Sequence, residues 1–231
     1  MKESFITEAE KHTEIAGKYD VIVAGSGPSG FAAAVTAARN GAKTLIIEAQ
    51  SGVGGISTSG LMSHFTGRVD SRLYSEILER SHKQDFFKCD DKVRIDPELL
   101  KNTYLEMLQA AGVDILLYTL VCDVIKNGDR VCGVITENKS GRRAYLADVL
   151  IDGTGDGDLA CRAGAEYFKG RESDGKMQPA TLMFKVGGVD MSRAVFPPSF
   201  ETTVETDKGE LQALAKKLLP YPAGHVLLYA S

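Results

Sequence analysis

The stretch that decides the fold is Asp20-Val21-Ile22-Val23-Ala24-Gly25-Ser26-Gly27-Pro28-Ser29-Gly30. Its apolar start predicts a buried strand, and the spacing G-x-G-x-x-G follows where that strand ends. Alanine-rich residues 31–39 predict a helix, and residues 43–47 predict a second strand that leads directly into Glu48. The sequence therefore predicts a complete β-α-β unit.

Each part of this unit has a physical role in binding a dinucleotide. Gly25 permits a tight turn, Gly27 lets the backbone approach a pyrophosphate, and Gly30 allows the helix to pack closely on the strand. The helix N-terminus directs free N–H groups and a positive dipole end at the phosphates. Glu48 is placed to accept hydrogen bonds from ribose hydroxyls. A glycine-rich turn in an unrelated α/β protein could share the spacing, but the strand, helix and acid in this order favour dinucleotide binding.

Length and composition are those of an ordinary globular protein. The 231 residues allow one large domain or one and a half smaller ones, with 43% hydrophobic and 25% charged residues. The net charge of −4 and the lack of a basic run argue against a nucleic-acid partner. No signal peptide or membrane-spanning stretch is visible, so we expect a cytoplasmic protein without a membrane partner.

The four cysteines give no sign of a redox or metal site. Cys89, Cys122, Cys132 and Cys161 form no C-x-x-C pair and no cluster with metal-ligand spacing. We therefore expect reduced, mostly buried cysteines and no metal.

A glycine- and hydroxyl-rich loop, residues 49–60, follows the predicted ribose-binding acid. It could be a flexible surface connection, or its backbone could run flat against a ligand, which Gly54 and Gly55 would permit. Its position directly after Glu48 favours the second interpretation.

The middle of the chain separates two kinds of dinucleotide-binding domain. Helices are expected over 70–83 and 97–110, the second capped by Asp96, and a third parallel strand over 113–117. Three further strands are expected over the ranges 120–126, 130–137 and 142–150, joined by hairpin-type turns. A simple nicotinamide-binding domain would place a crossover helix here. An antiparallel meander is instead typical of FAD domains of the glutathione-reductase-like superfamily.

The next segment extends this resemblance. Val149-Leu150-Ile151-Asp152-Gly153-Thr154-Gly155-Asp156-Gly157-Asp158 resembles the second FAD fingerprint of that superfamily, with Gly153 where alanine is usual. Together with residues 156–165 and 170–184, it resembles the FAD-dependent oxidoreductases related to the fumarate-reductase branch. The likeness covers residues 18–190.

The resemblance implies a fold and a set of cofactor contacts. The fold would be a doubly wound (Rossmann-like) α/β FAD-binding domain with an inserted antiparallel β-meander, followed by part of a β-rich second domain. Glu48 would bind the adenosine ribose, Val121 would meet the adenine, and Ile56 would lie with its glycine neighbours near the phosphate and flavin end. The pyrophosphate would be held by Gly25, Ser26, Gly27, Pro28, Ser29 and Gly30. The loop after Glu48 would contribute Gly54 and Gly55, and the second cofactor turn would consist of Gly153, Thr154, Gly155 and Asp156.

Three segments are expected along the chain: an N-terminal helical arm (1–17), the FAD-binding domain (18–165) and the start of a substrate domain (166–231). In the last, a strand is expected over 180–189, a helix over 209–219 and a strand over 223–231. Because this final strand stops in mid-run, the chain reads as the N-terminal portion of a longer enzyme, completed by a C-terminal half or a second subunit. Alone, it is expected to bind FAD weakly and to show no appreciable turnover.

The expected function is transfer of a hydride or electrons between a small-molecule substrate and bound flavin. The alternatives are an NAD-dependent dehydrogenase, or a non-catalytic dinucleotide-binding module or subunit completed by another chain. No catalytic residue is identified. His64, Arg171 and Glu172 are the polar residues to inspect first, whereas Asp156 and Asp158 fit a solvated turn and helix cap better than acid–base catalysis.

Overall fold

A computed structural model describes residues 8–62, 64–66, 69–81, 92–178, 180–190, 192–194, 204–210, 213–214 and 217. The chain divides into two units, Met1–Met183 and Phe184–Ser231, and each is described by itself.

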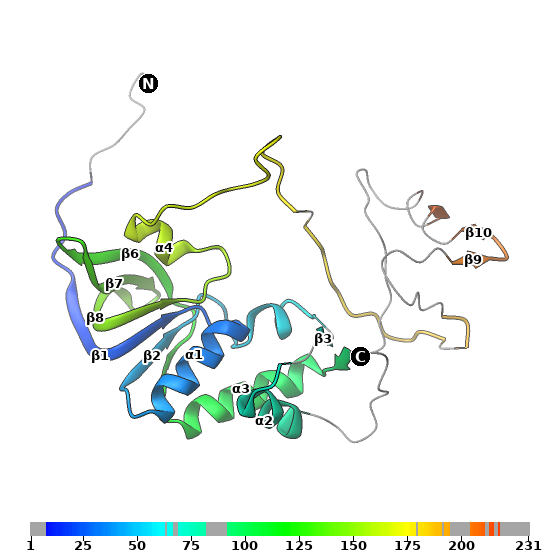
Figure 1. The fold of residues 1–231 in the computed structure, drawn as a ribbon, viewed down its shortest axis with the longest axis horizontal. Coiled ribbons are helices and arrows are strands. Elements are labelled where there is room, and N and C mark those ends of the chain that lie inside the picture. The colour runs from blue at the N-terminus through cyan, green and yellow to red at the C-terminus, as the bar shows by residue number, and fades with distance from the viewer. Residues whose placement is uncertain are drawn as a thin grey trace. The chain divides into compact units, whose positions relative to one another are not determined.

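The first unit is built on a six-stranded sheet with the order β5-β2-β1-β8-β7-β6 (Figure 1). Neighbours among β5, β2, β1 and β8 are parallel, whereas β7 is antiparallel to both β8 and β6. The strands are β1 (Glu14–Ala24), β2 (Thr44–Ile47), β5 (Asp114–Leu116), β6 (Leu120–Asn127), β7 (Arg130–Asn138) and β8 (Gly141–Asp152). The predicted β-α-β unit, third parallel strand and antiparallel meander are confirmed.

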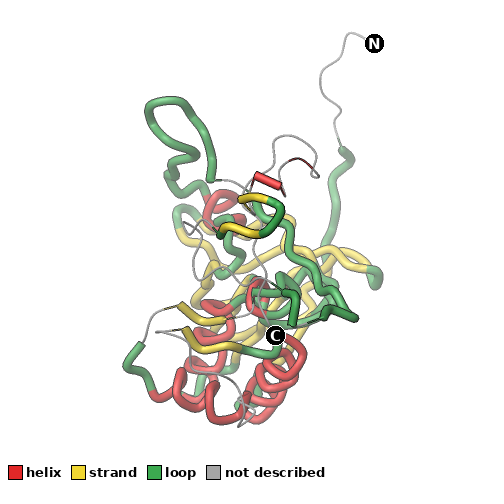
Figure 2. The backbone as a smooth tube through the Cα atoms, turned by 90° about the vertical axis from the view of Figure 1, so that its right-hand side faces the viewer, coloured by secondary structure: helices red, strands yellow, loops and turns green. Residues whose placement is uncertain are grey.

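Three helices pack on one face of this sheet: α1 (Pro28–Arg39), α2 (Arg72–Ser81) and α3 (Pro97–Ala110). Figures 1 and 2 show them on the same side of the strands. Phe31 of α1 stacks on Tyr104 of α3, with ring centroids 3.8 Å apart and planes 9° apart. Burial raises the pKa of Tyr104 to about 12. As predicted, Asp96 caps α3 by accepting hydrogen bonds from the Glu98 and Leu99 N–H groups.

The meander covers the opposite face of the parallel strands. Its side chains Val121, Val134 and Tyr145 belong to one buried cluster with Leu45 and Ile47 of β2. Strand β8 pairs with β7 through its first half and with β1 along nearly its whole length. It therefore joins the meander to the parallel sheet.

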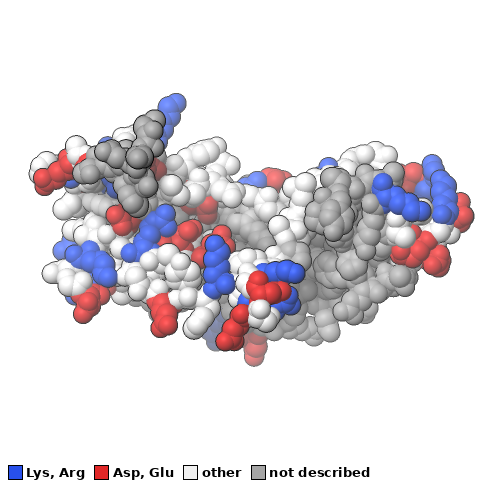
Figure 3. All heavy atoms as spheres, turned by 90° about the horizontal axis from the view of Figure 1, so that it is seen from above, with Lys and Arg blue, Asp and Glu red and all other residues white. Residues whose placement is uncertain are grey.

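Smaller elements complete the described residues. In the first unit these are the one-turn helix η1 (Gly55–Ser57), the pair β3 (His64–Thr66) and β4 (Lys92–Arg94), and α4 (Asp158–Ala163). In the second unit, β9 (Glu205–Thr206) and β10 (Gly209–Glu210) form a short hairpin. None of the helices described is long and apolar enough to cross a membrane. Figure 3 shows basic and acidic side chains interspersed over the described surface of one face.

The expected N-terminal helical arm is wrong where the structure describes it. Strand β1 begins at Glu14, and residues 8–13 contain no helix. Glu14 pairs with Arg143 of β8, beyond the buried part of the sheet. Because the side chains at this end of β1 are exposed, its sequence lacks the apolar run that marks a buried strand. Residues 1–7 lie outside the described part.

Two expectations near the C-terminus are also wrong. Residues 180–189, expected as a strand, are irregular wherever they are described, and Leu182 and Phe184 are exposed. The apolar alternation is present, but a strand also requires a hydrogen-bonding partner. The helix expected over 209–219 begins instead with β10, although Ala213, Leu214 and Lys217 are helical. The expected strand over 223–231 lies outside the described residues.

We predict that Phe31→Ala will lower the free energy of unfolding by about 3–5 kcal/mol, because it removes a fully buried ring from the α1–α3 contact. Urea unfolding measures the difference. The control is Phe168→Ala, since Phe168 is 94% exposed, and its effect should be within about 0.5 kcal/mol. Equal stability of the two variants would contradict the packing described here.

Candidate dinucleotide-binding site

The site lies where three parallel strands end together. Ala24, the last residue of β1, is paired with Ile47 of β2 and with Asp152 of β8. The residues that follow these strands, Gly25, Glu48 and Gly153, are therefore neighbours at the carboxyl edge of the sheet. Ligands of open α/β sheets bind in the crevice outside this edge.

Two of the three fingerprint glycines are required by the fold itself. Gly25 has φ +86°, and a Cβ placed there would lie 2.4 Å from the Gly153 carbonyl oxygen. A Cβ on Gly30 would lie 2.0 Å from the Gly25 carbonyl oxygen. The start of α1 can approach the end of β1 only because neither residue has a side chain.

Gly27 differs, because the protein around it has room for a side chain. Its φ is −59°, and the nearest atom to an added Cβ, the Gly153 carbonyl oxygen, is 3.9 Å away. Neither backbone conformation nor packing explains the glycine. A ligand that approaches the backbone at this position does explain it.

The N-terminus of α1 begins at this same glycine. Gly27 is the N-cap residue, no side chain caps the helix, and its first turn contains no acidic residue. The Gly27 carbonyl accepts a hydrogen bond from the Phe31 N–H at 2.8 Å, so the helix starts regularly. Uncapped N–H groups and the positive end of the helix dipole fit a pyrophosphate.

Glu48 is held rigidly beside this turn. The Ser26 N–H and hydroxyl donate to one carboxylate oxygen at 2.8 and 2.6 Å, and the Gln50 N–H donates to the other at 2.9 Å. The Glu48 backbone N–H donates to Leu116, and its carbonyl accepts from Thr119. The side chain is 8% exposed. Because a carboxylate has about four acceptor positions, Glu48 retains capacity for a ribose hydroxyl.

The loop after Glu48 packs against the fingerprint turn. The Gly54 N–H donates to the Ser26 carbonyl at 2.9 Å, and a Cβ on Gly55 would lie 2.9 Å from the Gly27 Cα. The Thr58 hydroxyl closes the loop on the Val53 carbonyl at 2.6 Å. This loop is therefore built against the turn rather than free on the surface. Ile56, in η1, is exposed.

The second turn follows β8 and touches the first. The Gly153 N–H donates to the Ala24 carbonyl at 2.7 Å, and a Cβ on Gly153 would lie 2.9 Å from the Gly30 Cα. This contact leaves little space for the alanine usual in the resembling fingerprint. Thr154 is half-buried, Gly155 has φ +89°, and Asp156 is exposed.

Asp152 organises this second turn and was assigned no role from the sequence. One carboxylate oxygen accepts hydrogen bonds from the Thr154 N–H and hydroxyl at 3.0 and 2.7 Å. The other accepts from the Ala160 N–H in the first turn of α4 at 2.8 Å. Burial opposes its ionisation, but these hydrogen bonds outweigh burial and lower the pKa of Asp152. The sequence feature that could have identified Asp152 is an acidic residue that ends a strand directly before a glycine turn.

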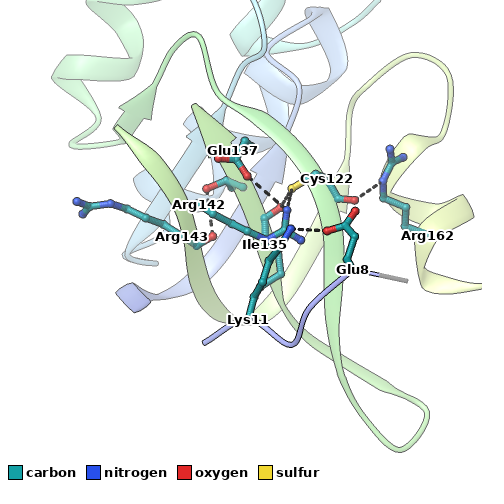
Figure 4. Close-up of polar contacts among 9 residues, drawn as sticks. Glu8, Lys11, Cys122, Ile135, Glu137, Arg142, Arg143 and Arg162 are labelled. Atoms are coloured by element: carbon teal, nitrogen blue, oxygen red, sulfur yellow. Dashed lines mark hydrogen bonds and ion pairs between the residues drawn. The ribbon is translucent and has the colours of Figure 1, made fainter. Parts of the chain in front are cut away.

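Val121 lies in β6, two residues beyond Thr119, whose N–H donates to the Glu48 carbonyl. It is buried and paired with Thr136 of β7. The adjacent Cys122 is fixed from two sides (Figure 4): Arg142 donates to its sulfur at 3.5 Å, and Arg162 donates to its carbonyl at 3.0 Å. These contacts hold the strand in which Val121 lies.

The prediction that the cysteines are mostly buried is wrong for the described ones. Cys122 and Cys132 are half-buried, and Cys161 is exposed. Their thiols serve local hydrogen bonding: Cys122 and Cys132 donate to backbone carbonyls of the meander at 3.4 Å. Cys89 lies outside the described residues.

The polar residues singled out for inspection do not join this site through any described contact. His64 is buried in β3, opposite Arg94. Arg171 and Glu172 are exposed in a local turn, where Arg171 pairs with Asp174 at 2.8 Å. The structure brings together the glycine turn, Glu48, the following loop and the second turn.

Asp152→Asn should lower the free energy of unfolding by about 1–3 kcal/mol at neutral pH, since an amide N–H₂ would face the Thr154 or Ala160 donors. Because the folded-state pKa of Asp152 is lowered, its contribution is present above the unfolded pKa of about 3.9 and is lost as pH falls through the folded value. The difference between the two proteins should therefore shrink below about pH 4. Urea titrations at several pH values measure it, and a constant difference would contradict the assignment.

Comparisons with known proteins agree with this geometry. A thiamine thiazole synthase of Methanococcus maripaludis is 32% identical over 146 residues, covering 59% of this chain and 55% of that protein. A digeranylgeranylglycerophospholipid reductase of Methanococcoides burtonii is 28% identical over 202 residues, covering 77% of this chain and 47% of that protein. The chain thus spans about half the length of the curated relatives it matches.

Among solved structures, THI4 of Thermovibrio ammonificans aligns with a TM-score of 0.50 and 22% identity over 63% of this chain and 61% of that one. A geranylgeranyl bacteriochlorophyll reductase-like protein of Thermoplasma acidophilum aligns with a TM-score of 0.51 and 20% identity over 67% and 43%. These two likenesses show the fold alone.

The family model described as FAD dependent oxidoreductase matches residues 20–223. The chain therefore belongs to the FAD-dependent oxidoreductase family, and its cofactor is FAD.

Proposed function

We propose that this chain forms the FAD-binding part of an oxidoreductase that transfers a hydride or electrons between a small-molecule substrate and the flavin. The observation that carries the proposal is the space beside Gly27, at the uncapped N-terminus of α1. The preceding residue, Ser26, donates a hydrogen bond to the Glu48 carboxylate. The residues proposed to bind the phosphates and the ribose therefore lie next to each other at one turn. When bound, FAD supplies the redox chemistry, and this chain binds and orients it.

The proposed contacts assign each part of FAD to a segment of the site. The pyrophosphate meets the turn from Gly25 to Gly30, and Glu48 accepts the ribose hydroxyls. Val121 lies beside the adenine. Gly54, Gly55 and Ile56 lie toward the flavin. The second turn is formed by Gly153, Thr154, Gly155 and Asp156.

The family match supports a redox enzyme, whereas the relatives do not specify its reaction. One is named a thiazole synthase and another a phospholipid reductase, so their names do not agree on a substrate class.

Two other functions are less well supported. An NAD-dependent dehydrogenase would share the β-α-β unit, but the meander and the family match favour FAD. A non-catalytic FAD-binding subunit would share every contact above. Reduction of bound FAD by a small donor separates that subunit from an enzyme, and release of FAD on denaturation separates both from an NAD protein. Stoichiometric NAD without flavin would contradict the proposal.

Gly27→Ala should bind FAD at least about ten-fold more weakly while leaving the free energy of unfolding within about 0.5 kcal/mol of wild type. The added methyl group fits the protein and fills the space at the turn. Flavin fluorescence titration and urea unfolding measure the two effects. Gly30→Ala is the matched variant, and it should lose stability because its methyl group meets the Gly25 carbonyl. Unchanged FAD affinity in the Gly27 variant would contradict the pyrophosphate assignment.

Glu48→Ala should weaken FAD binding by about 1.5–3 kcal/mol, roughly ten-fold or more, through loss of the ribose contact. The control is Glu79→Ala, which removes an exposed carboxylate from α2 and should leave FAD affinity unchanged. Fluorescence titration of both variants measures the effect. If both bind FAD as wild type does, Glu48 does not contact the ribose.

A further inference from the structure

Tyr118, between β5 and β6, has an unusual backbone conformation. Its φ is +51°, and within the described chain only one other non-glycine residue, Leu61, has positive φ. For a bulky side chain this conformation is a genuine outlier, because Cβ approaches the backbone. Such strain persists only where surrounding contacts impose it, and it concentrates at ligand-binding sites.

The contacts that impose it tie Tyr118 to the ribose-binding segment. The Tyr118 N–H donates to the Gln50 carbonyl at 3.0 Å, and the Thr119 N–H donates to the Glu48 carbonyl at 3.0 Å. Thr119 is buried, and its hydroxyl accepts a hydrogen bond from the Asn138 side chain at 3.1 Å. The backbone on both sides of Tyr118 is therefore fixed against Glu48 and the meander.

The strained backbone does not serve to bury the ring. Tyr118 is 70% exposed, so its side chain contributes little to the core. The conformation instead holds a large aromatic side chain at the surface of a rigid segment. In the chain, Tyr118 lies one residue before Thr119, which is hydrogen-bonded to Glu48, the proposed ribose acceptor, and three residues before Val121, which is proposed to lie beside the adenine.

We propose that the Tyr118 ring stacks on the adenine of the bound dinucleotide. The inference rests on the proposed function, which places the adenosine half of FAD at Glu48. Aromatic side chains bind bases through their π-faces, and the gain is largest when the ring is already fixed. Tyr118 offers such a ring at the surface, on a backbone that is fixed one residue before the Glu48–Thr119 hydrogen bond.

The experiment titrates the protein with ADP, which carries the adenine, ribose and pyrophosphate without the flavin, and uses inorganic pyrophosphate as the probe without adenine. Tyr118→Ala should raise the dissociation constant for ADP roughly 10- to 100-fold and leave that for pyrophosphate unchanged. Tyr118→Phe keeps the ring and should stay within roughly three-fold of wild type. Tyr167→Ala is the matched control, since Tyr167 is 63% exposed and belongs to none of the segments proposed to contact adenosine.

Tyr118→Gly separates stacking from a structural role. Glycine adopts positive φ without strain, so this variant should be at least as stable as wild type to heat while binding ADP as poorly as the alanine variant.

Equal ADP affinity of wild type and Tyr118→Ala would overturn the stacking inference while leaving the site at Glu48 intact. If wild type binds pyrophosphate but not ADP, the adenosine assignment fails, and the Tyr118 inference fails with it. If wild type binds neither probe and no FAD, the proposed function itself fails.

Discussion

The structure depends on three backbone segments that approach more closely than side chains allow. The end of β1, the start of α1 and the turn after β8 meet at Gly25, Gly30 and Gly153, and a Cβ on any one of them would lie within 3 Å of backbone atoms of another. This contact places the N-terminus of α1 at the carboxyl edge of the sheet, where the positive end of a helix dipole favours an anionic ligand. Gly27, the fourth glycine at this point, is not required by that contact. The fold therefore explains three glycines but not the fourth, which lies at the proposed pyrophosphate site.

At this edge of the sheet, neutral groups donate hydrogen bonds to the Glu48 carboxylate. Ser26 and Gln50 orient the Glu48 carboxylate through N–H and hydroxyl groups, and these hydrogen bonds stabilise the charge without cancelling it. Such a carboxylate remains available to hydroxyl groups of a ribose and is unfavourable for a phosphate attached to that ribose. The backbone also fixes the position of Glu48, because its N–H and carbonyl are hydrogen-bonded to Leu116 and Thr119, where the chain passes from β5 to β6. Hydrogen bonds therefore connect Glu48 both to the parallel sheet and to the segment that leads into the meander.

Much of this was predictable because it depends on local pattern. The apolar run before Gly25, the helix after it and the acid at Glu48 follow from periodicity and turn chemistry, and the hairpin signals at 127–129 and 138–141 located the meander. The errors occurred where tertiary partners decide. Glu14–Gly17 lack an apolar run but belong to a strand because β8 extends alongside them, whereas residues 180–189 are mostly apolar but lack a paired strand where described. Tyr118 could not have been recognised from sequence at all, because its importance lies in a backbone angle.

Glu48 and Asp152 show why residue identity alone could not complete the site. Both are acids at the carboxyl ends of strands that flank β1, and both accept hydrogen bonds from a backbone N–H and a hydroxyl near a glycine turn. The two residues differ in the hydrogen-bond partner of the second carboxylate oxygen. In Asp152 it accepts from Ala160 and so ties β8 to α4, which makes the residue part of the turn's internal framework. In Glu48 it accepts only the nearby Gln50 N–H among the bonds described, and the carboxylate lies beside the turn whose open glycine leaves room for a ligand. The same chemical group thus stabilises the fold at one strand end and is available for recognition at the other, and the partner of the second oxygen determines which.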